Sequence, residues 1–473
     1  MSLYDEHANN GHGGGYAVPN ILADLPSRMT ELCTQEQLRA VNKIVHSRGG
    51  LVWWRVGEGK TRIALFTFAA LQNIHQWALP SICLVVCRRK AFRDWRDEIE
   101  RCFPECDVYE DSCPAHPPRL APCFLLVSEG MLVKQQKLLA SNWQIRFICY
   151  DESWLYANPK STRSKAAYDL SRPRKAIALS GTVMKARDTS EIWAQCKIVH
   201  KHRLIASSLS AFRENFQVCF SDLGFPLWSS KKGAYADIMH RLSEVTDVHF
   251  PKSSRQIHEQ FHTIEATEQQ RRYFRELKEF YSIDDLDMEF NNAMVVITKA
   301  QQISCGWIFN EAGNLVSIPS NKPAKLRDEL EDIIASGQRA VVWCAFRHDV
   351  EMLAKFLPFA TMQMLGGEDF DVDRWLAGDV SVCLATEASG SSVNHFAQVP
   401  YAIYFSSDFK WLSMQQSRGR TDRKSSTHLD CYYKYLQVDG SMDAHVFRTA
   451  MGSGDKESKL ILQAELRTWF NKR

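Results

Sequence analysis

Short apolar runs alternate with helix-like stretches along much of this chain. Between about residue 30 and residue 200, several runs have the length and apolar character of buried strands. These runs are Leu51–Trp54, Ile82–Cys87, Phe124–Val127, Phe147–Tyr150 and Ala176–Leu179. Helical spacing is found between them, at Arg62–Leu71, Ala91–Cys102 and Thr162–Leu170. Strands that alternate with helices predict a parallel α/β sheet.

The same alternation returns in the last third of the chain, at Ala340–Ala345, Val380–Ala385 and Tyr401–Phe405. The stretch from about residue 200 to 320 is expected to be mostly helical, and Lys456–Phe470 has the spacing of an amphipathic helix. We therefore predict an α/β protein with two parallel-sheet lobes and a helical region between them.

The domain boundaries follow from this pattern and from a length of 473 residues, which leaves room for two or three domains. We predict a flexible N-terminal tail at 1–25 and a first lobe with a helical extension at 26–245. A helical linker that begins the second half is expected at 246–325, and a second lobe with a C-terminal helix at 326–473.

Composition excludes several classes of protein. Hydrophobic residues make up 45% of the chain and charged residues 24%, so a folded core is expected rather than a disordered chain. The apolar runs are far shorter than the ~18 residues of a membrane span. The 14 cysteines, without a recognisable export signal, indicate reduced thiols in a cytoplasmic or similar compartment. A net charge of +3 allows a local basic groove but not a generally basic surface.

A glycine loop follows the first predicted strand. Leu51–Trp54 leads into Arg55-Val56-Gly57-Glu58-Gly59-Lys60-Thr61, and a helical stretch comes next. Gly57 and Gly59 allow backbone N–H groups to turn toward an anion, and the following helix presents its N-terminus to it. In such loops the lysine reaches the β- and γ-phosphates of a nucleotide and the hydroxyl of Thr61 ligates Mg²⁺. The loop is thus predicted to bind the phosphates of a nucleotide with Mg²⁺.

An acidic pair, Asp151-Glu152, follows the strand-like run that ends at Tyr150. Ligands and catalytic groups of open α/β sheets lie at the carboxyl ends of the strands. We therefore expect Asp151 to hold Mg²⁺ and Glu152 to orient and deprotonate an attacking water.

Two arginines in the second half, Arg420 and Arg423, lie about one helical turn apart and project from one side. Two guanidinium groups on one face can reach a γ-phosphate across a cleft and stabilise the charge of the transition state.

Two further features have an ordinary structural interpretation. The stretch from Cys102 to Cys123 also contains Cys106, Cys113 and His116, but it lacks the C-x-x-C spacing of a zinc site. Trp53 and Trp54, beside the glycine loop, are expected in the core rather than as stacking platforms.

Taken together, these segments resemble helicase superfamily II, and within it the Swi/Snf-like DNA translocases, over about residues 30 to 450. Gln37 resembles the adenine-reading glutamine, GEGKT resembles motif I, and LSGT at Leu179–Thr182 resembles motif III. The remaining similar segments are LVVCRRKAFRDWRDEI (motif Ia), LLVSEGML (motif Ib), DESWLYANPKSTRSKA (motif II), TIEATEQQRRYFREL (start of the second half), VVWCAF (motif IV), ATEASGSSVN (motif V) and QSRGRTDR (motif VI).

The resemblance implies two RecA-like lobes and assigns further roles. The nucleotide would be ATP, and it would be bound by Gln37 and by the loop residues Gly57, Glu58, Gly59, Lys60 and Thr61. The residues that would take part in hydrolysis are Lys60, Asp151, Glu152, Gln416, Arg420 and Arg423. Ser180 and Thr182 would couple hydrolysis to movement. DNA would be bound by Arg88, Lys90, Ser128 and Thr386.

The sequence departs from the family at several positions. Trp154 stands where motif II usually has a His that couples to the motif VI glutamine, and Ser389 and Ser392 stand where motif V usually has glycines. Arg88 stands where motif Ia often has Pro, and Trp54 where motif I usually has Gly.

None of these departures removes a catalytic group, so we expect an active, divergent ATPase that works as a monomer on DNA. Double-stranded or branched DNA is the expected partner, because the Asn158-containing stretch resembles the duplex-tracking branch. One alternative is a strand-separating helicase. Another is a nucleotide-gated nucleic-acid clamp that scarcely hydrolyses ATP, which Trp54 and Trp154 would favour.

Overall fold

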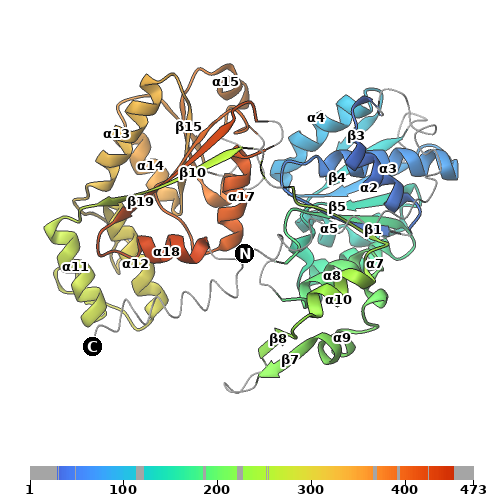
Figure 1. Ribbon diagram of the computed structural model, residues 1–473, viewed down its shortest axis with the longest axis horizontal. Helices are drawn as coiled ribbons and strands as arrows, with labels where there is room; N and C mark the ends of the chain where they lie inside the picture. The colour runs from blue at the N-terminus through green and yellow to red at the C-terminus, as the bar shows by residue number, and fades with distance from the viewer. Residues whose placement is uncertain are drawn as a thin grey trace. The chain divides into compact units, whose positions relative to one another are not determined.

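The computed structural model describes residues 29, 31–47, 49–112, 122–184, 188–220, 227–251, 253, 255–365, 370–390, 395–423 and 426–451. They fall into two compact units, Met1–Lys252 and Ser253–Arg473 (Figure 1). The expected tail at 1–25 and the expected helix at Lys456–Phe470 lie outside the described residues.

The first unit is built on a seven-stranded sheet with the order β3-β4-β2-β5-β6-β1-β9, and its strand pairs are parallel. The strands, in chain order, are β1 (Gly49–Trp54), β2 (Ile82–Val86), β3 (Asp107–Glu110), β4 (Cys123–Val127), β5 (Ile145–Tyr150), β6 (Lys175–Ser180) and β9 (Thr246–His249). β1 lies between β6 and β9, and β5 lies between β2 and β6.

Helices cover both faces of this sheet, because alternate strand residues point to opposite sides. Val52 and Trp54 pack with α2 (Gln35–Val45), α3 (Lys60–His75) and α4 (Phe92–Cys102). Leu51 and Trp53 pack with the helices of the other face. Those helices are α5 (Glu129–Lys134), α6 (Gln136–Ser141), α7 (Thr162–Ser171), α8 (Ser190–Ile198), α9 (Leu209–Phe216) and α10 (Ala234–Arg241).

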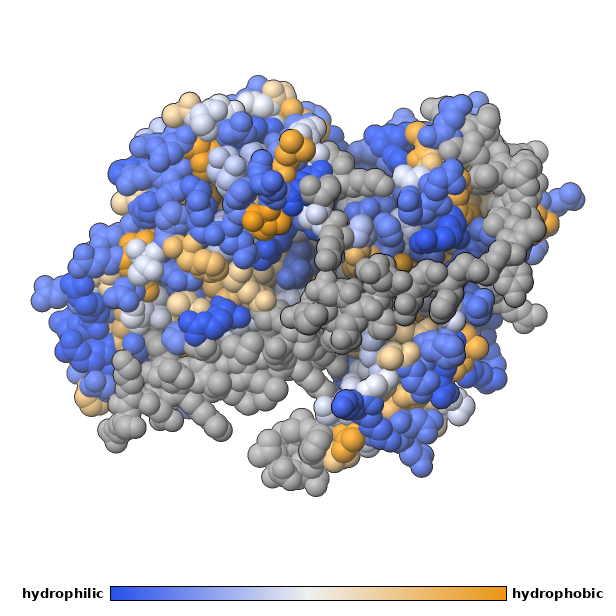
Figure 2. All heavy atoms as spheres, viewed as in Figure 1, coloured by the Kyte–Doolittle hydropathy of each residue, from blue (hydrophilic) through white to orange (hydrophobic). Residues whose placement is uncertain are grey.

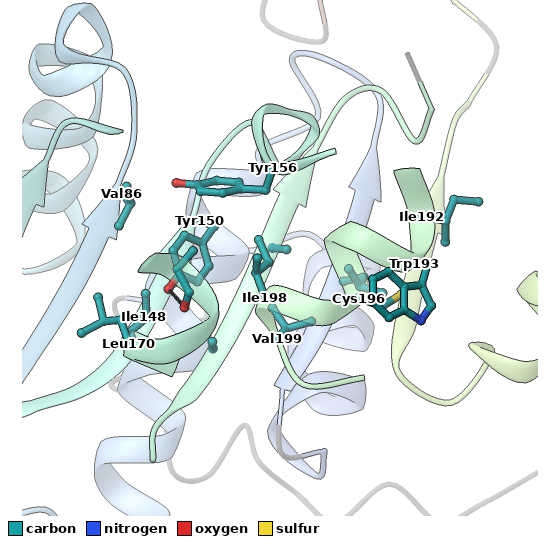
Figure 3. Packing of buried hydrophobic residues seen from close by; sticks show 14 of the residues in the cluster. Val86, Ile148, Tyr150, Tyr156, Leu170, Ile192, Trp193, Cys196, Ile198 and Val199 are labelled. Carbon is teal, nitrogen blue, oxygen red and sulfur yellow. Dashed lines mark hydrogen bonds between the residues drawn. The ribbon is translucent and has the colours of Figure 1, made fainter. Parts of the chain in front are cut away.

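The core on this second face contains a pair of tyrosines beside the end of β5 (Figure 3). The rings of Tyr150 and Tyr156 meet edge to face, with centroids 5.2 Å apart. The Tyr150 hydroxyl donates to the carbonyl of Ala167 at 2.9 Å and lies 2.7 Å from the hydroxyl of Ser171. These contacts fix the carboxyl end of β5 against α7.

The second unit contains a six-stranded parallel sheet with the order β10-β19-β18-β15-β17-β16. Its strands are β10 (Gln256–Ile264), β15 (Ala340–Cys344), β16 (Thr361–Met364), β17 (Val382–Thr386), β18 (Tyr401–Tyr404) and β19 (Asp430–Val438). α13 (Lys322–Ala335) and α14 (Arg347–Phe356) pack on one face, and α15 (Val372–Ala377), α17 (Trp411–Thr421) and α18 (Asp443–Ala450) pack on the other.

A further cluster of this unit joins α11 (Glu268–Glu279) and α12 (Ala293–Cys305) to two small hairpins. The hairpins are β11 (Ser282–Ile283) with β12 (Met288–Glu289), and β13 (Trp307–Phe309) with β14 (Leu315–Ser317). A third hairpin, β7 (Gln217–Phe220) with β8 (Leu227–Ser230), belongs to the first unit. The short elements are α16 (Glu387–Gly390), η2 (Arg89–Ala91), η3 (Ser153–Tyr156), η4 (His202–Leu204) and η5 (Asp284–Leu286).

The predicted α/β class with two parallel-sheet lobes is confirmed. The middle of the chain is less helical than predicted, because hairpins and the nine-residue strand β10 lie within it. β10, β3 and β9 are polar strands at the edges of their sheets, and they lack the continuous apolar character that marks a buried strand.

Among the residues coloured in Figure 2, hydrophilic ones predominate, and the hydrophobic ones form separate groups. Among the described helices, none has both the length and the apolar character required to cross a membrane.

Candidate functional site

Three predicted segments meet at one edge of the first sheet. β5, β6 and β1 are consecutive parallel strands, so the segments that follow them leave the sheet at the same edge. A Cβ atom added to Gly181, after β6, would lie 2.6 Å from the Val56 side chain and 3.6 Å from Lys60 Nζ. The positive charge of Lys60 also acts on Asp151, after β5. The structure therefore brings the glycine loop, the acidic pair and the LSGT segment together.

The glycine loop has the backbone that its sequence predicts. Gly57 and Gly59 have φ values of +89° and +84°, in the left-handed region that glycine adopts at little cost. Gly59 is the N-cap of α3 and supplies no side-chain cap. A helix N-terminus attracts an anion. Thr61 lies in the first turn of this helix. The Lys60 ammonium donates to the carbonyls of Trp54 at 3.0 Å and Arg55 at 3.2 Å.

Gln37 braces the glycine loop from α2. Its side-chain Nε2 donates to the carbonyl of Gly59 at 3.2 Å and to that of Glu58 at 3.4 Å. Its Oε1 accepts from the N–H of Thr34 at 3.0 Å, which forms the capping box that begins α2. A Cβ atom on Gly59 would lie 2.2 Å from Gln37 Nε2, so a side chain there would displace the Gln37 amide. Gln37, the residue predicted to read adenine, thus contacts the glycine loop itself.

Trp54, the departure in the loop motif, belongs to the core, as does Trp53, and this confirms the prediction for both. The Trp54 indole N–H donates to Asp247 Oδ1 on β9 at 2.7 Å. Its ring centroid lies 4.6 Å from that of His249. Trp54 therefore contacts the edge strand β9 beside the glycine loop.

Asp151 is held by two N–H donors. Its Oδ2 accepts from the Trp95 indole of α4 at 3.0 Å, and its Oδ1 accepts from the backbone N–H of Glu152 at 2.9 Å. Burial raises the pKa of Asp151, and the negative charge of Glu152 also raises it, whereas the Trp95 bond and the Lys60 charge lower it. The net result is a pKa of about 6.

Glu152 has a left-handed backbone, with φ at +49°. Residues other than glycine rarely adopt this conformation, and such strain collects at functional sites. Its Oε2 accepts from the indole N–H of Trp154 at 2.6 Å. Trp154, the departure from the motif II pattern, is therefore the partner of the predicted base.

The LSGT segment is fixed by bonds within itself. The Ser180 hydroxyl donates to the carbonyl of Thr182 at 2.6 Å and accepts from the Thr182 N–H at 2.9 Å. Both residues are buried. This rigid turn carries Gly181 against Val56 and Lys60.

The predicted DNA-binding residues of the first unit follow two neighbouring strands. Arg88 comes after β2, and its guanidinium carbon lies 5.1 Å from the centroid of the Trp154 ring. Lys90 is half-buried in η2. Ser128, after β4, is the N-cap of α5, where its hydroxyl accepts from the N–H of Met131 at 3.4 Å.

In the second unit, the predicted residues are well enclosed. Thr386 is 9% exposed, and its hydroxyl donates to Ser389 Oγ at 2.8 Å. Gln416 and Arg420 lie one turn apart on α17 and, like Arg423 beyond its end, are buried. The Arg423 Nε–H donates to the carbonyl of Gly419 at 3.0 Å.

The side chains near Lys60 are of the types that bind a magnesium–nucleotide complex, because such a complex requires a carboxylate, a hydroxyl and an ammonium group. Among the residues that the structure describes, no group of three or more His, Cys, Asp or Glu side chains is placed to hold a metal by itself. Of the cysteine-rich stretch, Cys113 and His116 lie outside the described residues.

The contacts of three residues at this site carry no signal in the sequence. Trp95 and Gln195 lie far along the chain from the groups that they contact. Trp154 stands out in the sequence only as a departure from motif II, and its bond to Glu152 is seen only in the structure. Gln195 Oε1 accepts from the Ser153 hydroxyl at 2.6 Å and thereby fixes the turn after the acidic pair.

Comparison with known proteins adds little. No family model matches the chain, and no curated protein does. Among solved structures, it is similar to the Sulfolobus solfataricus SWI2/SNF2 ATPase core in complex with dsDNA, with 17% identity and a TM-score of 0.40. That similarity covers 92% of this chain and 96% of the other. A likeness at this level bears on neither the fold nor the function.

Proposed function

We propose that this protein is an ATP-dependent DNA motor of the Swi/Snf-like branch of helicase superfamily II. The observation that supports it most is the meeting of Lys60, Asp151 and Gly181 at one edge of a parallel sheet, beside a glycine loop. The order of the family-like segments along the sequence supports the same proposal.

In this proposal, ATP phosphates take the place of the carbonyls that Lys60 now contacts, and the N-terminus of α3 faces the anion. Thr61 and Asp151 hold Mg²⁺, which neutralises phosphate charge when it is bound. Glu152 accepts a proton from the attacking water. Gln416, Arg420 and Arg423, of the second unit, complete the hydrolytic machinery.

Duplex DNA is the proposed substrate of the motor, and the protein acts on it as a monomer. Arg88, Lys90 and Ser128 of the first unit, with Thr386 of the second, contact phosphates of one strand. Such contacts are independent of base sequence and weaken as salt rises, because each neutralised phosphate releases counterions.

The decisive experiment measures phosphate release by the full chain alone, with duplex DNA, with single-stranded DNA and with RNA. Turnover should rise most with the duplex. Glu152→Gln should bind ATP but lose turnover by roughly 10²- to 10⁴-fold, because an amide cannot accept the proton. Lys60→Ala should weaken ATP binding. Glu100→Gln, which removes an exposed carboxylate from α4, is the matched control and should retain full turnover.

Other outcomes separate the alternatives. Stronger stimulation by single strands, together with efficient unwinding of a forked duplex, would indicate a strand-separating helicase. ATP binding without turnover would indicate a nucleotide-gated clamp. Normal hydrolysis by Glu152→Gln would show that another group is the base.

A further inference from the structure

One indole joins a candidate DNA contact to the candidate base. The Trp154 N–H donates to Glu152 Oε2 at 2.6 Å, and the Arg88 guanidinium lies over the same ring, 5.1 Å from its centroid. Arg88 follows β2 and Trp154 follows β5, and these strands are neighbours in which Val86 pairs with Tyr150. We propose that Trp154 is a positioning residue, which couples a phosphate contact at Arg88 to the placement of the Glu152 carboxylate.

The chemistry of the two contacts allows both to act at once. A guanidinium over an aromatic ring is attracted by the ring face, while its N–H bonds point outward in its own plane, where a phosphate can accept them. The indole has a single polar hydrogen, and it is used on Glu152. A phosphate that orients Arg88 therefore also orients the ring and, through its N–H, the carboxylate.

The backbone that carries Trp154 is anchored on both sides of it. The Ser153 hydroxyl donates to Gln195 Oε1 at 2.6 Å, and the Gln195 amide donates to the carbonyl of Val183 at 2.7 Å. Tyr156 is fully buried against Tyr150 (Figure 3). Because η3 is held in this way, a change at Arg88 reaches Glu152 through the half-buried side chain of Trp154 rather than through the backbone.

The first unit also offers a matched control. The Arg146 guanidinium lies 5.3 Å from the centroid of the Trp143 ring, so it forms the same kind of pair. Trp143 is 62% exposed and lies before β5, at the opposite end of the strand from the acidic pair.

The inference rests on the proposed function, so the test compares nucleic-acid stimulation among variants of the full chain. Trp154→Phe keeps an aromatic face for Arg88 but removes the N–H. It should lower turnover at saturating duplex DNA by about tenfold to hundredfold, as misplaced catalytic groups do. The ratio of stimulated to unstimulated turnover should fall with it. The KM for ATP and the Kd for duplex should change by less than about threefold, as neither ligand loses a direct contact.

Arg88 provides a second test of the coupling, because its half-buried side chain forms the other contact of the Trp154 ring. Arg88→Lys keeps a cation for the phosphate but lacks the planar fork. It should bind duplex nearly as tightly as the wild type and lose most of the stimulation. Arg88→Lys combined with Trp154→Phe should be no worse than Trp154→Phe, because both break one chain of contacts. Trp143→Phe and Arg146→Ala should leave stimulation unchanged.

If duplex DNA stimulates the wild type, three results would refute the coupling but not the proposed function. The first is full stimulation of Trp154→Phe, and the second is an equal loss of turnover in this variant with and without DNA. The third is a double variant in which the losses of turnover from Arg88→Lys and Trp154→Phe multiply. A wild type whose turnover no nucleic acid stimulates would instead refute the proposed function, and the coupling with it. Thermal unfolding of each variant establishes that a loss of turnover is not a loss of fold.

Discussion

Asp151 shows how opposing local effects set the charge of one residue. Its enclosure and the adjacent Glu152 favour the protonated form, while the Trp95 N–H and the Lys60 charge favour the carboxylate. Burial prevails, and the pKa lies at about 6. In the proposed site, Mg²⁺ would bind the ionised form of Asp151, so the ion would compete with the proton for this group.

This pKa makes a prediction for stability in the absence of metal and nucleotide. An unfolded chain has an aspartate pKa of about 3.9, so the folded protein holds the proton more tightly. The contribution of Asp151 to stability is therefore greatest below about pH 4 and is lost as the pH rises through about 6. Asp151→Asn carries no such charge. The melting temperature of this variant, relative to wild type, should rise by a few degrees between pH 4.5 and pH 7.5.

Calorimetry in the presence of a chelator makes this measurement. Asp97→Asn, which removes an exposed carboxylate from α4, gives the change that a surface aspartate produces. If the melting temperatures of Asp151→Asn and Asp97→Asn depended on pH in the same way, burial would not raise the pKa of Asp151.

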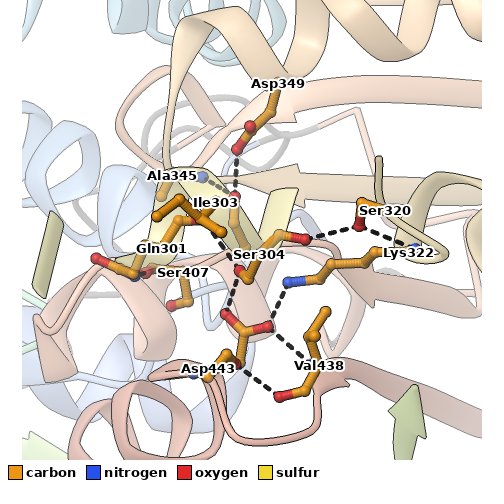
Figure 4. A network of polar contacts seen from close by, with 12 residues as sticks. Gln301, Ile303, Ser304, Ser320, Lys322, Ala345, Asp349, Ser407, Val438 and Asp443 are labelled. Atoms are coloured by element: carbon orange, nitrogen blue, oxygen red, sulfur yellow. Dashed lines mark hydrogen bonds and ion pairs between the residues drawn. The ribbon is translucent and has the colours of Figure 1, made fainter. Parts of the chain in front are cut away.

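At the scale of elements, a buried ion pair joins several segments of the second unit (Figure 4). The Lys322 ammonium, at the start of α13, lies 2.7 Å from Asp443 Oδ2, at the start of α18. The same carboxylate accepts from the Ser304 hydroxyl of α12 at 2.9 Å and from the Val438 N–H of β19 at 3.0 Å. The Lys322 and Asp443 side chains are 0% and 4% exposed, so water cannot replace either partner.

Replacement of Lys322 should therefore lower the unfolding free energy substantially. Lys322→Ala leaves the Asp443 carboxylate buried without its counter-charge, and we expect a loss of about 3–5 kcal/mol in unfolding free energy. Urea unfolding of the second unit, followed by circular dichroism and limited proteolysis, measures this loss.

The control is the exposed pair Arg347–Glu351 of α14, whose side chains are 71% and 41% exposed. Arg347→Ala should cost less than about 1 kcal/mol. Equal losses in the two variants would mean that the buried pair contributes no more than a surface pair.

At the scale of the whole molecule, the proposed hydrolysis draws on both halves of the chain. The glycine loop and acidic pair belong to the first unit, while Arg420 and Arg423 belong to the second. Arg420 is 4% exposed, near the end of α17. If Arg420 acts on the γ-phosphate, it is required for the chemical step rather than for binding of the nucleotide.

Arg420→Ala should therefore leave ATP affinity nearly unchanged and slow hydrolysis on the order of 10³- to 10⁵-fold. Arg420→Lys should recover little, because lysine lacks the planar fork. Nucleotide binding, single-turnover hydrolysis and thermal unfolding should be measured together. Arg339→Ala, which removes another arginine of this unit from the amino end of β15, should hydrolyse ATP normally. Normal hydrolysis by Arg420→Ala would refute its role.

The sequence by itself determined the α/β class, the strands with continuous apolar character and the glycine loop. These follow from local physics, since burial on both faces requires apolar runs and a left-handed loop requires glycine. The meeting of Lys60, Asp151 and Gly181 also follows once the strands are parallel neighbours, but the strand order itself came from the structure.

Only the tertiary structure decided the partners of the site. Trp95 reaches Asp151 from α4 and Trp54 reaches Asp247 on β9, across gaps in the sequence that no spacing rule spans. Trp154 looked like a departure from a motif, yet its indole N–H holds the candidate base. The polar edge strands β3, β9 and β10 were missed for a related reason. Their place depends on hydrogen bonds to a neighbouring strand, and backbone groups carry no signal in the sequence.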